Sequence, residues 1–113
     1  MKKNKNNLQV IDIGHSGLSL DSAQIKFETA VSDAIYEGEI RVLKIITGHG
    51  SGELKKIVRR WCKDQEGRFK GVINGENYHM FDNMAAEMRS ECQIRNDNDF
   101  GRKDSAITYI WLW

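Results

Sequence analysis

The apolar positions of this chain follow a strand period in some segments and a helical period in others. Two short runs rich in β-branched residues, 8–13 and 41–47, are each followed by a glycine, which predicts two strands. Apolar residues recur at helical spacing after each run, first from Ala23 to Ile35 and then within a predicted helix that spans Glu53 to Gln65. The first half of the chain therefore predicts the order strand, helix, strand, helix.

The two predicted helices carry clear local signals. Asp21, followed three residues later by Gln24, is typical of an N-cap with a capping-box partner. Gly38 stands where a C-cap glycine is expected. The second helix has one apolar face, formed at positions i, i+3, i+4, i+7 and i+8 by Leu54, Ile57, Val58, Trp61 and Cys62.

The segment after Gly67 predicts a strand, a turn and a short helix. Residues 68–73 have a strand pattern, and Asn74 with Gly75 is a strong type I′ turn signal. Residues 76–80 are therefore expected to pair back as a hairpin. Asp82 is expected to cap a short helix whose apolar residues are Met84, Ala85, Met88 and Cys92.

A polar loop and a last strand complete the chain. The loop covers residues 95–104, and the strand covers 106–113. Its aromatic residues occupy alternate positions: Tyr109, Trp111 and Trp113. One face of this strand is expected in the core, and the other either stacks bases or covers the sheet. Together the elements favour an α/β fold, a two-layer sandwich with a four-stranded mixed sheet, a βαβαββ core and a small insertion before the last strand.

Composition excludes several classes of protein. With 40% hydrophobic and 29% charged residues, the 113-residue chain is neither wholly disordered, nor collagen-like, nor a disulfide scaffold. No apolar run approaches the roughly 18 residues of a membrane span. The start MKKNKNN lacks the apolar stretch of a signal peptide, so a cytoplasmic protein with reduced Cys62 and Cys92 is expected.

Charge is balanced overall but clustered locally. The net charge is +1, which by itself argues neither for nor against nucleic acid. Five cations crowd into the second helix: Lys55, Lys56, Arg59, Arg60 and Lys63. Such a cluster can follow a phosphate backbone, or it can be an ordinary solvated face.

The order of elements brings two histidines together. A strand–helix–strand unit has parallel strands, so the loops that follow both strands emerge at the same edge of the sheet. His15 lies in the loop after the first strand, and His49 lies in the loop after the second. If these strands are neighbours, both histidines face one crevice.

The loop around His49 suits a phosphate. Gly48, Gly50 and Gly52 stand between a strand and a helix, where unpaired N–H groups and the helix dipole attract anions. The spacing is neither the dinucleotide fingerprint GxGxxG nor a P-loop, because no Gly-Lys-Ser/Thr follows. A tight turn needed only for packing is the alternative.

Three segments resemble the small MutS-related (Smr) domain family, in the family's order. ITGHGSGELKKIVRRW (46–61) resembles its second signature, VIDIGHSGLSLDSA (10–23) its first, and GRKDSAITYIWLW (101–113) its last strand. The resemblance implies a compact α/β sandwich similar to the C-terminal domain of translation initiation factor three. It also implies a nucleic-acid-binding domain, in many members a nicking nuclease or an RNA endonuclease acting on branched DNA or on mRNA at stalled ribosomes.

Two departures from the family pattern stand out. Gly14 is an extra residue between Ile13 and His15, which either displaces the imidazole or is absorbed in a bulge. Residues of about 75–100 exceed the family's usual connection and are interpreted as an insertion. The expected organisation is a flexible basic tail over 1–7 and one Smr-like domain over 8–113.

The site residues carried over from the family are Asp12 and His15 from the first signature, and Thr47, Gly48, His49 and Gly50 from the second. His15 and His49 can supply base and acid for phosphodiester cleavage, with Asp12 orienting His15. The alternatives are that His15 is only a surface histidine and that His49, at the variable position of its motif where a cation is common, contacts the phosphate; for His49 phosphate contact is favoured over proton transfer. The N–H groups of Gly50, Ser51 and Gly52 are expected to hold the phosphate. The neighbouring phosphates of the nucleic-acid backbone would contact Lys55, Lys56, Arg59 and Arg60.

The substrate and the metal requirement stay open at this point. Without a metal the natural substrate is RNA, because its own 2′-hydroxyl can attack the phosphorus. With Mg or Mn held by Asp12 and either His15 or His49, branched DNA is also a possible substrate. A binding module without cleavage is one alternative, and a ribosome- or protein-binding module acting through residues 76–100 is another. The structural alternatives are that Asp12 only caps its loop and that Thr47 only ends its strand.

Overall fold

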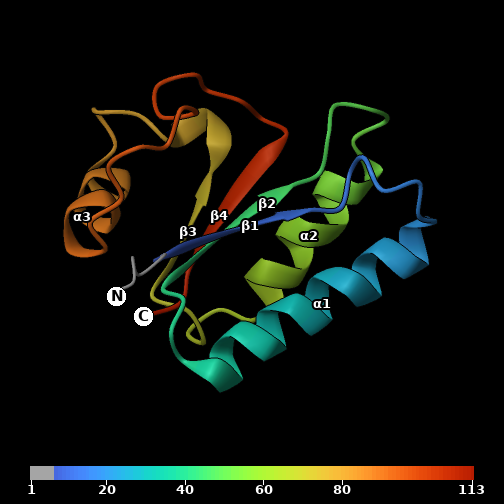
Figure 1. Ribbon diagram of the computed structural model, residues 1–113. Coiled ribbons are helices and arrows are strands. Elements are labelled where there is room, and N and C mark those ends of the chain that lie inside the picture. Colours follow the sequence, from blue (N-terminus) through green and yellow to red (C-terminus); the bar gives the residue numbers. More distant parts are fainter. Residues whose placement is uncertain (1–6) are drawn as a thin grey trace.

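The computed structural model describes residues 7–113 (Figure 1). Its elements are β1 Leu8–Asp12, α1 Leu20–Glu37, β2 Val42–Ile46, α2 Glu53–Asp64, β3 Gly71–Asn74, a 3₁₀ turn η1 Gly75–Asn77, α3 Asn83–Glu91 and β4 Ile107–Trp111. The sheet has the order β1-β2-β4-β3. β1 pairs parallel with β2, whereas β4 runs antiparallel to both β2 and β3, so the predicted mixed four-stranded sheet is confirmed.

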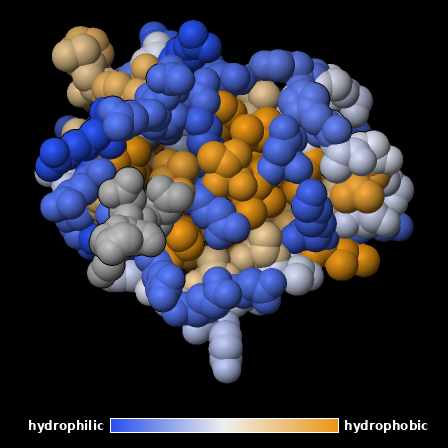
Figure 2. Space-filling model, viewed as in Figure 1, coloured by the Kyte–Doolittle hydropathy of each residue, from blue (hydrophilic) through white to orange (hydrophobic). Residues whose placement is uncertain are grey.

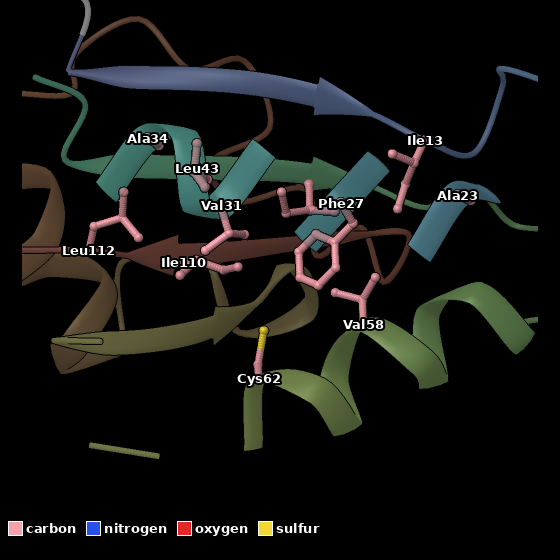
Figure 3. Close-up of a cluster of buried hydrophobic side chains, with 11 residues drawn as sticks. Ile13, Ala23, Phe27, Val31, Ala34, Leu43, Val58, Cys62, Ile110 and Leu112 are labelled. Carbon is pink, nitrogen blue, oxygen red and sulfur yellow. The ribbon is translucent and has the colours of Figure 1, made fainter. Parts of the chain in front are cut away.

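Helices α1 and α2 cover one face of this sheet (Figure 1). Figure 3 shows Phe27, Val31 and Ala34 of α1 and Val58 of α2 directed toward the strands. All four side chains are at most 2% exposed, and they form one core with alternate residues of β2 and β4. The apolar faces predicted for both helices are thereby confirmed, except that Ile35 of α1 is 40% exposed.

The segment expected as an insertion covers the opposite face. α3 contributes Ala85 and Met88 to a second core, together with Tyr78 from the loop before it. Tyr109 and Trp111 of β4 belong to this second core, at 0% and 3% exposed. These aromatic residues therefore cover the sheet and are not available to stack on bases.

Strand β1 forms one edge of the sheet. Figure 2 shows apolar residues in the middle of the face that carries β1, between hydrophilic margins. Val10 is 51% exposed there. Of the tail expected over 1–7, residues 1–6 lie outside the described part of the chain. Asn7 is anchored, because its side chain donates a 2.7 Å hydrogen bond to the carbonyl of Cys92.

Two local predictions were wrong. The N-cap of α1 is Ser19, not Asp21, and its hydroxyl accepts a hydrogen bond from the N–H of Ser22. The hairpin after Asn74 does not form, because Gly75 begins a 3₁₀ turn and β3 pairs with β4 instead. The predicted C-cap Gly38 and the N-cap Asp82 are both confirmed. No helix within residues 7–113 has the length and hydropathy needed to cross a bilayer.

Candidate functional site

An aspartate and a histidine form a pair at the carboxyl end of β1. The Oδ2 atom of Asp12 lies 3.0 Å from Nδ1 of His15. Its Oδ1 atom accepts hydrogen bonds from the backbone N–H groups of Gly14 and His15, at 3.0 and 3.2 Å. The slight burial of Asp12 raises its pKa, but the hydrogen bonds from His15 and Gly14 outweigh this, so the pKa lies below its ordinary value of 3.8. The carboxylate therefore stays ionised beside the imidazole.

This pair leaves the other ring nitrogen of His15 available. The side chain is 69% exposed, and Nε2 has no hydrogen-bond partner within residues 7–113. A carboxylate hydrogen-bonded to Nδ1 fixes the orientation of the ring. His15 is thus exposed to solvent next to an ionised carboxylate, and its catalytic role stays a prediction.

Gly14 brings the first loop against the second. Its N–H donates to the carbonyl of Ile46 at 3.1 Å. A Cβ placed on Gly14 would lie 2.4 Å from the carbonyl carbon of Thr47 and 2.7 Å from the nitrogen of Gly48. Only glycine allows this backbone approach. The extra glycine therefore joins the two loops, and the pair of Asp12 with His15 forms despite it.

The loop after β2 presents backbone N–H groups at the start of α2. Gly48 and Gly52 adopt φ of 77° and 84°, and Gly52 is the N-cap of this helix. The N–H groups of Gly50, Ser51 and Gly52 donate to no other group in the part of the chain that the structure describes. Unpaired N–H groups at the positive end of a 12-residue helix form a site suited to an anion.

A second histidine–carboxylate pair lies at the same edge of the sheet. Nε2 of His49 is 3.2 Å from Oδ1 of Asp104, and the side chains are 73% and 31% exposed. Asp104 was not among the predicted site residues. The available signal was topological: β4 runs antiparallel to β2, so the loop that enters β4 arrives where β2 ends.

The cations of α2 divide into two groups. Lys56 and Arg60 are exposed, and Lys55 is half-buried, so they remain candidates for contact with a phosphate backbone. Arg59 has a different role. Its Nη1 and Nη2 atoms lie 2.9 and 2.8 Å from the carboxylate oxygens of Glu76, and Nε donates to the hydroxyl of Thr108.

Two predicted phosphate contacts are therefore structural. Arg59 also donates to the carbonyls of Ser105 and Ile107, so its guanidinium fixes the entrance to β4. Thr47 is buried, and its hydroxyl donates a 2.9 Å hydrogen bond to the carbonyl of Ala106. These contacts favour the strand-end role that the sequence left open for Thr47.

The cysteines are not suited to nucleophilic chemistry. Cys62 and Cys92 are both buried and free. Burial raises the pKa of Cys62 to about 12, against a smaller lowering by Arg59. Burial also raises the pKa of Cys92. Both thiols therefore act as small apolar groups of the two cores.

The donor set does not resemble a metal site. No group of three or more His, Cys, Asp or Glu side chains converges anywhere in residues 7–113. The oxygens of Asp12 already accept hydrogen bonds from Gly14 and His15. Mg²⁺ at such sites is bound by one or two carboxylates together with substrate phosphates, so these residues form no closed metal site in the absence of substrate.

Comparisons with known proteins agree with this fold. The crystal structure of the Smr domain of Thermus thermophilus MutS2 matches the fold with a TM-score of 0.60 at 16% sequence identity, over 93% of this chain and 98% of that one. No curated protein matches the sequence. The family model of the Smr domain matches residues 15–79, which include His15, His49, the glycine loop and α2 but not Asp12 or Gly14. The chain belongs to the Smr domain family, which is known for binding nucleic acid.

Proposed function

We propose that this Smr domain binds nucleic acid at the edge of the sheet where β1 and β2 end, and that it is an endonuclease acting on RNA or structured DNA. The observation that carries the proposal is the exposed pair of Asp12 with His15, at 3.0 Å, beside the glycine loop. The loop would hold the phosphate, and the imidazole would move a proton next to it.

Binding rests on backbone groups and cations. The N–H groups of Gly50, Ser51 and Gly52 would donate to the phosphate oxygens, aided by the dipole of α2. Lys56 and Arg60 extend from the same helix and would contact neighbouring phosphates. Since these are charge contacts, the affinity should fall steeply as salt rises.

Cleavage of RNA can be written with these groups alone. One imidazole takes the proton of the 2′-hydroxyl while the 2′-oxygen forms a bond to phosphorus. The bond from phosphorus to the 5′-oxygen breaks, and this oxygen receives a proton from a second donor. The products are a 2′,3′-cyclic phosphate and a 5′-hydroxyl. No step of this route needs a metal.

The test is a cleavage assay with the purified chain. Labelled single-stranded RNA and branched DNA are each incubated with Mg²⁺, with Mn²⁺ and with EDTA. We expect EDTA-resistant cuts in RNA that end in a cyclic phosphate. The variant His15→Gln should lose at least 10²-fold in rate while its RNA affinity stays within about threefold. Cuts only in DNA and only with metal would assign the other substrate.

Binding without cleavage would identify a non-catalytic module. In that case RNA affinity would remain salt-dependent, and no product would form at any excess of protein. Lys56→Gln with Arg60→Gln should weaken such binding whether or not the chain cleaves. An RNA affinity that changes neither with salt nor with these substitutions would contradict the proposed surface.

Contact with a protein partner such as the ribosome is the second candidate function. The observation in its favour is the loop before α3, where Met80 and Phe81 are 70% and 84% exposed. Deleting the whole segment is unsuitable as a test, because Tyr78, Ala85 and Met88 belong to a core. The variant Met80→Ser with Phe81→Ser leaves that core intact. Unchanged co-sedimentation with ribosomes would dispose of this candidate.

A further inference from the structure

His49 differs from an ordinary phosphate-binding cation in having a carboxylate partner. Oδ1 of Asp104 lies 3.2 Å from its Nε2 atom. An imidazolium paired with a carboxylate carries little net charge, so it attracts phosphate less than a free cation would. The same pairing orients the ring and favours the exchange of a proton. The contact therefore indicates proton transfer more than charge attraction.

The carboxylate is the fixed member of this pair. Oδ1 of Asp104 accepts the N–H of Ala106 at 2.9 Å, and its carbonyl accepts the N–H of Ile107 at 3.2 Å. A Cβ on Gly75 would lie 2.0 Å from that carbonyl oxygen, so the chain packs tightly against this turn.

Arg59 holds the same turn from the other side. Its guanidinium donates to the carbonyls of Ser105 and Ile107 while its ion pair with Glu76 anchors it. Asp104 therefore sits on a turn held by several hydrogen bonds, whereas His49 lies in an exposed loop between two glycines. The carboxylate is therefore held in place beside the exposed imidazole.

We propose that Asp104 is a positioning residue for His49, and that the two carry one of the two proton transfers of RNA cleavage. This inference rests on the proposed function. Nδ1 of His15 is hydrogen-bonded to Asp12, and Nε2 of His49 lies 3.2 Å from Asp104, so each ring keeps its other nitrogen without a hydrogen-bond partner within residues 7–113. One imidazole takes the 2′-hydroxyl proton as the bond to phosphorus forms. The other gives its proton to the 5′-oxygen as the second bond breaks.

Two variants separate this role from a structural or purely electrostatic one. Asp104→Asn keeps a side-chain oxygen that can accept the N–H of Ala106 but removes the charge that orients His49. His49→Arg leaves the turn untouched and keeps a cation in the loop. Asp64→Asn is the matched control, because it removes an equal charge from an exposed position at the end of α2.

The measurements are single-turnover cleavage of RNA in EDTA and RNA affinity by fluorescence anisotropy. We expect Asp104→Asn and His49→Arg each to lower the rate at saturating protein by about 10²-fold, with affinity within threefold of the unmodified chain. Asp64→Asn should cleave at the unmodified rate. Thermal unfolding of each variant is recorded in parallel.

Each alternative result has a distinct meaning. Full activity in His49→Arg would show that only charge is needed at this position, and full activity in Asp104→Asn would show that the carboxylate does not position the ring. Either result would overturn the inference while loss of activity in His15→Gln would still support the proposed function. A chain that cuts no RNA would overturn this inference, and one that cuts neither RNA nor branched DNA would overturn the proposed endonuclease function as well.

Discussion

Replacing Gly14 by alanine tests whether the contact between the two histidine loops shapes the site. The added Cβ would lie 2.4 and 2.5 Å from the carbonyl carbon and oxygen of Thr47, and 2.7 Å from the nitrogen of Gly48. All three are backbone atoms, so no change of rotamer relieves the overlap. The loop that carries His15 must move away from the loop that carries His49.

The size of the displacement follows from these distances. Ordinary contacts of a Cβ begin at 3.4 Å, against the 2.4 Å found at Thr47, so the loops must separate by about 1 Å. Overpacking of this kind costs about 1–3 kcal/mol in the free energy of unfolding. A displacement of about 1 Å between reacting groups lowers a catalytic rate by roughly 10²-fold.

Urea denaturation and single-turnover RNA cleavage measure the two effects separately. Gly50→Ala is the matched control for stability, because a Cβ on Gly50 meets no atom within 4 Å and its φ is not positive. We expect Gly14→Ala to lose stability and cleavage, and Gly50→Ala to unfold like the unmodified chain. A Gly14→Ala variant with unchanged stability and unchanged rate would refute the loop contact.

Three further predictions concern stability. Lys44→Met removes the cation that lies 2.7 Å from Asp97 and also contacts Asp99. The free energy of unfolding, measured by urea denaturation at pH 7, should fall by about 3–5 kcal/mol, and a loss under 1 kcal/mol would contradict the buried pair. Burial raises the pKa of Asp97, but hydrogen bonds from Lys44, Tyr109 and the Asp99 amide bring it below its ordinary 3.8. The ionised carboxylate therefore stabilises the fold above about pH 4, and the contribution is lost as pH falls further, so the acid loss of stability should be shallower in Asp97→Asn. Ser19→Ala should cost about 0.5–2 kcal/mol in thermal unfolding, because it removes the N-cap of α1, and an unchanged melting temperature would contradict that cap.

The sequence predicted those elements whose signals are local. The apolar faces of α1 and α2, the C-cap Gly38 and the N-cap Asp82 each depend on residues within two helical turns. The capping error at Asp21 has a local cause as well. Ser19 and Asp21 are both good N-cap residues, and the Gln24 that favoured Asp21 instead bonds to Glu28, four residues further along the helix.

The failed hairpin shows a local signal overruled by tertiary contact. Asn74 and Gly75 suit a type I′ turn, but Gly75 is used for another property of glycine, the absence of a Cβ next to the carbonyl of Asp104. Arg59 then bonds to Glu76 and holds the chain in a 3₁₀ turn beside β4. None of these partners is near in sequence, so no turn propensity could have shown them.

The same long-range arrangement explains which part of the site the sequence could predict. In a parallel pair of strands, the two loops after the strands share an edge, and this rule predicted that the loops carrying His15 and His49 lie at the same edge of the sheet. The rule says nothing of a strand that enters the sheet at that edge. Because β4 is antiparallel to β2, the loop ending at Asp104 arrives beside His49 and adds a carboxylate from 55 positions further along the chain. A mixed sheet can therefore supply its ligand edge from loops that precede strands as well as from loops that follow them, and the residues contributed in this way are those that sequence patterns alone leave out.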